Sequence, residues 1–532
     1  MNDSKPPTAL EKRAHNPTAL ARFHLPQLRQ KLPLVFPADA TLPPSPKPHY
    51  RSAYRYLGMA ELNAESLQLF SAFEISVQLF DYSALEPRLA AQLYVASAKG
   101  QVPFHPVSMY LLSLYRRERN LSRHGLLRLL RHPTDGQALR HWTGFADDLP
   151  SESGLRYFEG QLTPELQQEI SALQLDVLYQ AGLLPPQPGA ARRTKVSLAC
   201  DGMLHQARSR MRCSSVAAAC YQPAPRPCRA KEKGKQGCDC QDEACATRCG
   251  HATPRDPQAR FIVYTGRNKR AEASPNTPVD AQSQRPAASR LVYGYYSYTG
   301  QLLDDDCATY WILPAAFGPA TTGDAALFPA NLAYLRARFP WLDIGEVLAD
   351  AGAGEQPCLE AIWQAGALRL VDIRAHPLDT APDTQLTRGY NEHGHPLCPL
   401  GYVLHSNGYD YQRRRAKWRC AKQCQRDPDR PVPDCDYRQA SYKHGYTTTV
   451  GRAHADGSVR LAREIPYGSP AWRQRYHRRN AAESRNSALE RLGLKRMPQH
   501  GFQPGHVTVM QADFVTNQAT LVRLIRQATA LG

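Results

Sequence analysis

The spacing of apolar residues is helical from about residue 66 to residue 185. The segments SLQLFSAFEISVQLF and PVSMYLLSLYRRERNLSRHGLLRLL place apolar side chains three and four positions apart, as in helices with one buried face. In DDLPSESGLRYFEGQL, Pro150 followed by Ser151 or Ser153 predicts a capped helix start. The apolar stripe of that helix would be Leu155, Phe158 and Leu162.

The basic residues of this stretch would occupy the opposite helix faces. Against one acid, Glu118, the chain has six arginines between positions 116 and 131, namely Arg116, Arg117, Arg119, Arg123, Arg128 and Arg131. Short capped helices with basic faces fit a helix-turn-helix-like DNA-binding domain. Small basic helical bundles without that role share the pattern, so the pattern leaves both interpretations open.

A different pattern begins near residue 191. Short apolar runs rich in β-branched and aromatic residues predict strands at VSLAC, RFIVYTG, RLVYGYYSYTG, YWILPA, EVLAD and LRLVDIR. Helical patterns occur in ALFPANLAYLRARF and CLEAIWQAGA, and again over about 470–496 and 505–530. Strands first, then strand and helix alternating, predict an α/β fold with a mixed sheet. In contrast, residues 1–50 contain ten of the 43 prolines, which predicts an extended arm or a loosely docked tail.

Charge narrows the choice of partner. The 532 residues include 66 basic and 48 acidic side chains, so the net charge is +18 with His neutral. This excess favours a polyanionic partner, and nucleic acid is the commonest. No run approaches the roughly 18 apolar residues of a membrane span, and the first residues lack the apolar core of a secretory signal, so we expect a cytoplasmic protein. Phosphate-binding loops of the GxxxxGK[ST] type and the GxSxG and HExxH motifs are missing.

Two aspartates follow predicted strands. Asp201 comes after VSLAC and precedes Gly202, and Asp350 comes after EVLAD and precedes a flexible AGAG. In α/β sheets the carboxyl edge of the strands is where ligands bind. Each Asp would alternatively do no more than start a turn.

The third feature is a basic helix near the C-terminus. In RQRYHRRNAAESRNSALERLGLKR, residues Tyr476, Arg479, Glu483 and Glu490 are spaced to line one helical face. Residues 471–496 include eight Lys or Arg and two acids, a net charge of +6. An acid in such a basic field suits a helix that holds a cation beside phosphates. The alternative is an exposed helix with arbitrary arginines.

These three segments resemble the catalytic motifs of DDE transposases from bacterial insertion sequences. Asp201-Gly202-Met203, Asp350-Ala351-Gly352 and Tyr476-x2-Arg479-x3-Glu483 are similar to the group with the Tyr-Arg-Glu-Lys signature, and the resemblance runs from about 70 to 500. It includes HPVSMYLLSLYRRERNLSRHGLLRLL, which resembles the DNA-binding region of that family. One departure is that the position of the signature's Lys holds Glu490; Arg491 or Lys495 would have to take its role.

The resemblance implies an RNase H-like catalytic domain and a set of site residues. Asp201, Asp350 and Glu483 would bind two Mg²⁺ or Mn²⁺ ions for DNA cleavage and strand transfer. The expected partners are double-stranded DNA, as terminal inverted repeats and target, and a second copy of the chain, on the nucleoid of a bacterial cell. The phosphate contacts would come from Tyr476, Arg479, Arg478, Arg485 and Lys495. The expected parts are a Pro-rich arm (1–60), a helical DNA-binding domain (61–190), a catalytic domain (191–373 and 470–532) with a Cys-rich insertion (205–255), and an inserted subdomain (374–469).

The 14 cysteines include two groups that would bind structural zinc. In the second group, one pair of thiols is separated by three residues, a spacing found in zinc sites, whereas the first group falls in a Lys- and Gly-rich stretch with little to bury. Unbound thiols in loops are the alternative, and Cys200, Cys307 and Cys358 have the apolar context of core residues. The candidate ligands are Cys228, Cys238, Cys240, Cys245 and Cys249 in the first group, and Cys398, Cys420, Cys424 and Cys435 in the second.

Other interpretations remain open at this stage. Asp304, Asp305 and Asp306 form a further acidic cluster, in a position typical of a solvated hairpin turn. The chain would alternatively be an inactive transposase relative that regulates by binding DNA, a zinc-dependent nucleic-acid-binding module, or a nuclease of the same fold that cuts without joining.

Overall fold

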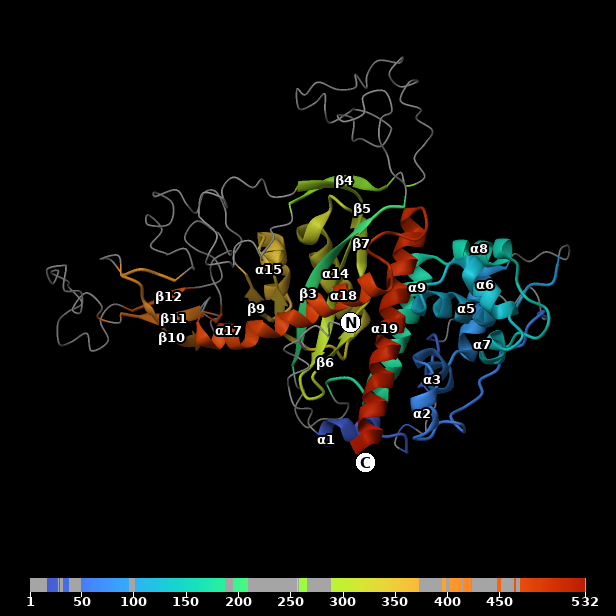
Figure 1. The fold of residues 1–532 in the computed structure, drawn as a ribbon. Helices are drawn as coiled ribbons and strands as arrows, with labels where there is room; N and C mark the ends of the chain where they lie inside the picture. The colour runs from blue at the N-terminus through green and yellow to red at the C-terminus, as the bar shows by residue number, and fades with distance from the viewer. Residues whose placement is uncertain are drawn as a thin grey trace, which may run out of the picture.

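An all-helical N-terminal region precedes a mixed α/β region in the computed structural model (Figure 1). The structure describes residues 17–26, 28, 32–37, 49–94, 101–186, 195–208, 256, 258–265, 289–372, 395–398, 402–410, 412, 415–420, 422, 447–450, 464–465 and 469–531. The Cys-rich stretch after residue 208 therefore lies outside the described residues almost entirely. All statements below concern the described part.

In the helical region, a side chain that accepts a hydrogen bond from the first turn begins α3 (Ala72–Leu79), α5 (Pro106–Glu118), α6 (Arg123–Arg131), α8 (Glu152–Gln161) and α9 (Pro164–Gln180). Ser71 and Glu74 form a capping box, and Ser151 accepts a hydrogen bond from the Gly154 N–H, which confirms the predicted start after Pro150. The predicted stripe of that helix, from Leu155 to Leu162, is buried. The other helices of this region are α2 (Ser66–Leu69), α4 (Glu86–Leu93) and α7 (Asp135–Thr143), with the 3₁₀ turn η2 (Ser83–Leu85).

The described part of the N-terminal arm is docked, so the expectation of an extended arm or loose tail is wrong there. It forms α1 (Pro17–Leu20), η1 (Ala21–Phe23) and the short strand β1 (Leu32–Pro33), which pairs with β2 (Phe80–Asp81). Phe23 and Leu34 are fully buried, and Arg22 forms an ion pair with Asp304. The apolar residues between the prolines pack on the body of the protein and override the local preference for extended chain.

The α/β region is built on a seven-stranded mixed sheet with the order β4-β5-β3-β8-β9, in which β6 and β7 also pair with β5. The strand β3 is antiparallel to β5 and parallel to β8, and β8 is parallel to β9. The predicted strands are confirmed; β7 was not predicted. Their bounds are β3 (Val196–Gln206), β4 (Arg260–Thr265), β5 (Ser289–Asp304), β6 (Thr309–Ile312), β7 (Ala316–Pro319), β8 (Ile344–Ala349) and β9 (Leu368–Val371).

Helices cover both faces of this sheet. Leu198 and Val347 share the main core with α14 (Gly323–Arg338) and α15 (Gln356–Gln364). Ala199 and Leu348, one residue further along each strand, point to the opposite face and pack against the segment formed by α17 (Pro470–Tyr476), η7 (His477–Arg479) and α18 (Asn480–Arg491). The sheet therefore has a face dedicated to the α17–α18 segment.

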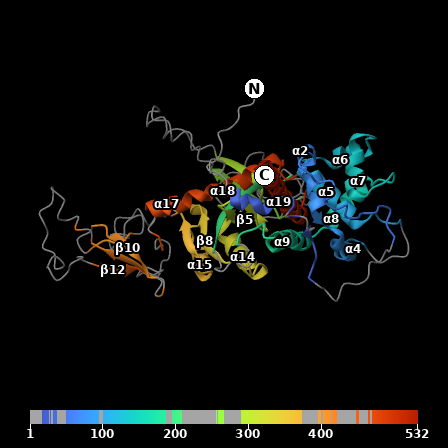
Figure 2. The ribbon, with the colours of Figure 1, turned by 90° about the horizontal axis from the view of Figure 1, so that it is seen from below.

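The C-terminal helix α19 (Phe502–Leu531) lies between the sheet and the N-terminal helices (Figures 1 and 2). It packs against α3, α5 and α9 on one side and against β6 on the other. Its buried positions include the polar residues Thr508, Asp513 and Asn517. Among the described helices, neither α19 nor any other combines the length and apolarity needed to cross a membrane.

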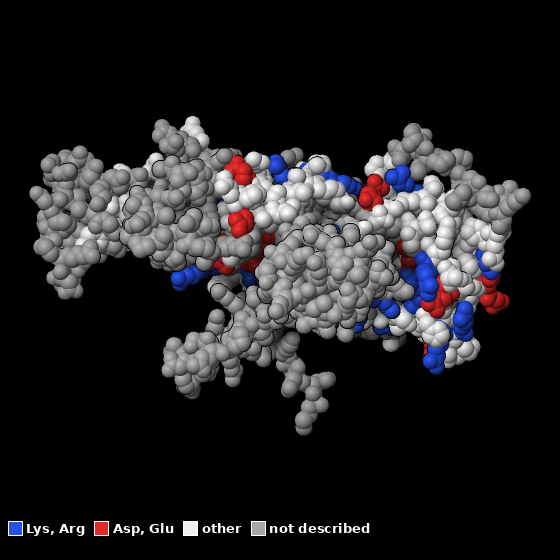
Figure 3. Space-filling model, turned by 90° about the horizontal axis from the view of Figure 1, so that it is seen from above, with Lys and Arg blue, Asp and Glu red and all other residues white. Residues whose placement is uncertain are grey.

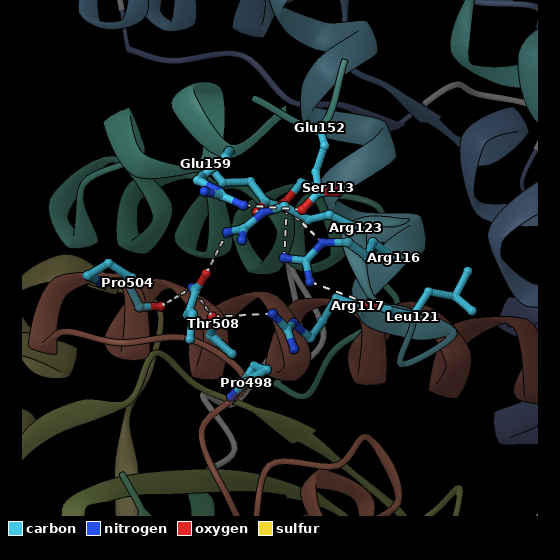
Figure 4. A network of polar contacts seen from close by, with 12 residues as sticks. Ser113, Arg116, Arg117, Leu121, Arg123, Glu152, Glu159, Pro498, Pro504 and Thr508 are labelled. Carbon is cyan, nitrogen blue, oxygen red and sulfur yellow. Dashed lines mark hydrogen bonds and ion pairs between the residues drawn. The ribbon is translucent and has the colours of Figure 1, made fainter. Parts of the chain in front are cut away.

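Arginines of α5 and α6 join these helices to α8 and α19 (Figure 4). The Arg116 and Arg123 Nε atoms donate to the two carboxylate oxygens of Glu159 at 2.7 and 2.6 Å, and Arg117 donates to the Thr508 hydroxyl at 3.2 Å. The side chain of Arg117 is 2% exposed, and its burial lowers its pKa to about 9. The expectation that these arginines line an outer basic face is therefore wrong for Arg116 and Arg117.

The outer surface of the helical region carries both signs of charge. On the face seen in Figure 3, Lys/Arg and Asp/Glu side chains are interspersed over these helices. On α6, Arg128 and Arg131 are exposed, and among the described residues neither has a polar partner. The solvent side of α6 is thus a part of the predicted basic face that remains available to a partner.

A small second sheet lies apart from the main one, on the side away from the helical region (Figure 2). It consists of β10 (His405–Asp410), β11 (Arg415–Arg419) and β12 (Thr447–Val450). Its core is Leu404, Ala416 and Trp418, with Cys398 and Cys420 packed beside them.

Candidate active site

Asp201 and Asp350 occupy matching positions on two neighbouring strands. The parallel pairing of β3 with β8 ends at Ala199 and Leu348, and each Asp lies two residues further along its own strand direction. Because side chains alternate along strands, both aspartates belong to the face that carries the α17–α18 segment. The sequence prediction that the two acids meet at this edge is supported by their electrostatic coupling, since Asp350 raises the pKa of Asp201.

One detail of the prediction is wrong, because Asp201 does not end its strand. The strand β3 continues to Gln206, paired with β5, and Asp201 lies opposite Thr299. The long β5 provides a partner for β3 beyond the point where β8 has ended. Asp201 is therefore held by a continuous strand on one side and is open toward Asp350 on the other.

Asp201 is half-buried and has two defined donors. Its Oδ1 accepts from the Gly202 N–H at 2.9 Å, and its Oδ2 accepts from Asn486 Nδ2 at 2.9 Å. Burial, followed by the charge of Asp350, raises the pKa of Asp201 to about 7. A nearby positive charge would stabilise its ionised form.

Asp350 leads the chain out of β8 into the turn η3 (Ala351–Ala353). Its Oδ1 accepts from the Gly352 N–H at 2.8 Å, so Asp350 also caps this turn. The turn interpretation and the site interpretation of Asp350 are therefore compatible. The second carboxylate oxygen is not used by the cap.

The α17–α18 segment brings Tyr476, Arg479 and Glu483 to the same region, but not as one straight helix. The 3₁₀ turn η7 separates the two helices, so the expected single face from Tyr476 to Glu490 is interrupted. Arg479 donates to Glu483 Oε1 at 3.0 Å. Burial by itself would lower the pKa of Arg479. The pKa is nevertheless raised, because four groups lie nearby: Tyr476, Asp201, Glu483 and Asp350. The Arg479 guanidinium thus lies within electrostatic reach of all three predicted acids.

Glu483 itself is largely exposed, with 56% of its side chain accessible. Among the described residues, no three Asp, Glu, His or Cys side chains form a group that would hold a metal ion as they stand. Asp201 and Asp350 do fit a hard divalent cation, because they are two oxygen donors whose mutual repulsion a cation would relieve. The buried Asn486 Oδ1, which has no hydrogen-bond partner among the described residues, adds an unused oxygen beside Asp201.

Tyr476 is fixed by neighbours that the sequence did not reveal. Its hydroxyl donates to Asp372 Oδ2 at 2.6 Å, and its ring stacks on Trp472 with 4.2 Å between centroids. Burial and this contact with Asp372 raise the pKa of Tyr476, so its hydroxyl stays protonated. It is a hydrogen-bond donor rather than a base.

Two of the arginines predicted to bind phosphate are used inside the protein. Arg485 is fully buried and donates from Nε and Nη2 to the two oxygens of Asp513 on α19, at 2.9 and 2.7 Å. Arg478 pairs with the buried Glu346 and with Asp305. The prediction is therefore wrong for Arg485, which no phosphate can reach in this conformation, and Arg478 anchors η7 to the sheet.

Lys495 remains exposed, with its ammonium 3.0 Å from the carboxylate of Glu490. Glu490 stands where the resemblance expects a lysine. Lys495, five residues after Glu490, therefore places a positive charge close to that position. The assignment of Lys495 stays a prediction.

Three site residues were missed by sequence reasoning. Asn486 had a weak signal, because it lies three residues after Glu483 and so on the same side of α18. Asp324, in the first turn of α14, and Tyr296, on β5, had none, since their proximity to Asp201 depends on how α14 packs on the sheet.

The Asp304–Asp306 cluster forms the predicted turn between β5 and β6. Asp305 and Asp306 are exposed, as expected, but Asp304 is buried with Arg22 and accepts from the Cys307 N–H at 3.2 Å. The expectation of a solvated turn is thus wrong for Asp304. Its charge is already matched inside the fold.

Two of the nine candidate zinc ligands are described. Cys398 and Cys420 are half-buried beside the core of the small sheet, and the Lys422 N–H donates to Cys420 Sγ at 3.2 Å. Cys424, Cys435 and the first cysteine group lie outside the described residues. Zinc binding therefore stays a prediction, whereas the expected core positions of Cys200, Cys307 and Cys358 are confirmed.

Comparisons with known proteins do not assign the chain. No protein-family model, no curated protein and no solved structure matches it significantly. The argument for function therefore depends on the geometry above.

Proposed function

We propose that this chain is a DNA transposase of the DDE type. The observation that supports it most is the matching position of Asp201 and Asp350 on adjacent parallel strands in the middle of the sheet. The strand order supports it as well: antiparallel strands β6/β7, β5 and β3, followed by the parallel strands β8 and β9, have the order of an RNase H-like sheet. The α18 helix, with Glu483, then crosses the same face as the two aspartates.

In this proposal Asp201, Asp350 and Glu483 hold Mg²⁺ or Mn²⁺. The bound cation would polarise a phosphodiester and favour ionisation of the attacking hydroxyl. Asn486 orients Asp201 through its 2.9 Å hydrogen bond, and Gly352 fixes one oxygen of Asp350. Glu483 would become the third cation ligand when Arg479 releases it and binds a DNA phosphate instead. Tyr476, as a protonated donor, would bind a second phosphate oxygen.

The reaction would take place in two displacements at phosphorus. Water attacks at the element end and the bond to the 3′ oxygen breaks, which frees a 3′-OH. That hydroxyl then attacks a phosphate of target DNA, so one phosphodiester forms as another breaks. The net charge of +18 supports a duplex DNA substrate.

The test is cleavage of DNA that carries the ends flanking the gene for this chain. We expect wild type, with Mg²⁺ or Mn²⁺, to cut these ends, and Asp350→Ala to bind them with equal affinity but not to cut. Asp306→Ala is the matched control, because Asp306 is an exposed acid of the β5–β6 turn. Cleavage by Asp350→Ala, or loss of cleavage in the control, would contradict the proposed site.

A second candidate is an inactive relative that regulates by binding the element ends. Two observations favour it. Glu490 stands in place of the expected lysine. Arg479 donates a hydrogen bond to Glu483, so Glu483 is paired with an arginine instead of joining the two aspartates at a cation. It predicts that wild type and Asp350→Ala bind the ends equally and that neither cuts them. The same experiment therefore separates the two candidates.

A further inference from the structure

Tyr296 and Asp324 form a hydrogen-bonded pair within electrostatic reach of both aspartates. The Tyr296 hydroxyl donates to Asp324 Oδ1 at 2.6 Å. Tyr296 comes from β5, opposite Leu204 of β3, and Asp324 comes from the first turn of α14. The pair therefore joins the antiparallel half of the sheet to the helix that covers the other face.

On one side, the pair fills the space beside Asp201. A methyl group on Gly202 would lie 2.0 Å from the Tyr296 hydroxyl oxygen and 2.2 Å from Cζ of its ring. The tyrosine thus lies directly on the backbone of the residue after Asp201, and only glycine leaves it that room. Any shift of Tyr296 would move or release this part of β3.

On the other side, the pair fills the space beside Asp350. A methyl group on Gly352 would lie 2.1 Å from Asp324 Oδ2 and 2.9 Å from Asp350 Oδ1. The N–H of the same Gly352 donates to Asp350 Oδ1 at 2.8 Å. Asp324 thus lies against the glycine that orients Asp350.

We propose that Tyr296 and Asp324 are positioning residues that set the separation of the Asp201 and Asp350 carboxylates. The inference rests on the proposed function, because it assigns the pair to the same cation-binding edge. The inference also rests on the geometry at two glycines. Gly202 is the residue after Asp201 and Gly352 is the second residue after Asp350, and each lacks the Cβ that would exclude the pair. The Tyr296–Asp324 hydrogen bond links the strand β3 at Gly202 to the turn η3 at Gly352.

The surroundings of the pair favour the carboxylate of Asp324 as acceptor and the hydroxyl of Tyr296 as donor. The first turn of a helix favours a carboxylate, so the α14 terminus stabilises Asp324 where it lies. Burial and the charge of Asp324 raise the pKa of Tyr296, and the tyrosine therefore remains the donor of the bond. Outer-shell groups that orient metal ligands typically change metal affinity by about 10- to 100-fold when they are removed. Tyr296 and Asp324 would act on the two aspartates through Gly202 and Gly352 rather than by a direct hydrogen bond, so we expect the lower end of that range.

The experiment measures Mn²⁺ affinity of the full chain, stripped of metal with EDTA, from the electron paramagnetic resonance signal of free Mn²⁺. We expect Tyr296→Phe, which keeps the ring, to weaken binding by about tenfold. Gly352→Ala, which displaces Asp324, should weaken it at least as much. Tyr295→Phe is the matched control, because the neighbouring Tyr295 donates at 3.1 Å to a different carboxylate, Asp256.

Melting temperatures distinguish positioning from a merely structural role. A structural role predicts that Tyr296→Phe and Tyr295→Phe lower the melting temperature alike and that both keep the Mn²⁺ affinity of wild type. That result would overturn the positioning role and leave the proposed function intact. Absence of Mn²⁺ binding by wild type would overturn the proposed cation site, and the inference with it.

Discussion

Arg485 gives the sharpest test of this structure, because sequence and structure assign it opposite roles. If Arg485 contacts a phosphate, its replacement would weaken DNA binding and leave the free energy of unfolding unchanged. In the structure it is 0% exposed, donates twice to Asp513 at 2.9 and 2.7 Å, and lies 3.3 Å from the Ser297 hydroxyl. Arg485→Met would keep most of the side-chain volume and leave the Asp513 carboxylate buried without its counter-charge.

The expected loss follows from that geometry. Removal of one partner from a buried ion pair costs about 3–5 kcal/mol, because the remaining charge is left desolvated. The free energy of unfolding of Arg485→Met, from urea titrations followed by tryptophan fluorescence, should fall by about this amount. The double variant Arg485→Met/Asp513→Leu should recover most of the loss, since a buried pair replaced by apolar side chains is often neutral or stabilising.

The same variants refute the reasoning if they behave otherwise. A loss below about 1 kcal/mol for Arg485→Met, with DNA affinity reduced, would return Arg485 to the phosphate-binding set and contradict the packing of α18 on α19. Failure of Asp513→Leu to rescue Arg485→Met would show that the ion pair is not the source of the loss. DNA affinity measured at two salt concentrations completes the comparison, because loss of a phosphate contact lowers the salt dependence.

Further predictions concern the acids, the helical region and the cysteines. Since the pKa of Asp201 is raised from 3.8 to about 7, the folded protein binds an extra proton between these values; stability should therefore fall as pH rises from about 4 to 7, and Asp201→Asn should be more stable than metal-free wild type at pH 8 by urea titration. An unchanged pH dependence in Asp201→Asn would contradict this. Glu159→Gln should lower the free energy of unfolding by about 3 kcal/mol or more, because it leaves the buried Arg116 without a counter-charge; a change within error would mean that the network in Figure 4 contributes little. Arg128→Ala/Arg131→Ala should lower DNA affinity and its salt dependence at constant stability, whereas an unaltered affinity would exclude α6 from the DNA surface. The purified protein should contain zinc by elemental analysis, and Cys420→Ser should lower the zinc content; a zinc-free protein would leave the thiols unbound.

The sequence was a good guide to the strands and to the two aspartates. Asp201 and Asp350 follow apolar runs, and the carboxyl ends of parallel strands meet at one edge, so local pattern and a general rule of sheets sufficed. The pattern did not reveal that β3 continues to Gln206, because the stabilising partner is a strand some 90 positions away along the chain, β5. It also did not reveal Tyr296 and Asp324, since their contact is made by packing between distant elements.

The burial of Arg485 was indicated by helical spacing, but the residue type was given more weight. Ala481 and Ala488, four residues before and three residues after it, are buried, so helical spacing placed Arg485 on the inner face of α18. An arginine in a basic stretch was instead interpreted as a phosphate contact. Burial of an arginine requires a specific partner, and that partner, Asp513, lies on a helix whose position the sequence does not reveal.

The buried arginines change where the basic charge is expected to act, but not its amount. Each internal pair, such as Arg485 with Asp513 or Arg369 with Glu464, removes one positive and one negative charge, so the excess of +18 is unaffected by them. In the proposed function, the charge that meets DNA would therefore reside on residues outside these pairs, among them Arg128 and Arg131 on the solvent side of α6. The argument from composition for a polyanionic partner thus stays a prediction. The expected basic helix face is exposed at Arg128 and Arg131 on α6, whereas it is buried at Arg116 and Arg117 on α5. A basic composition favours a polyanionic partner as a prediction, and burial excludes the residues that such a partner would not reach.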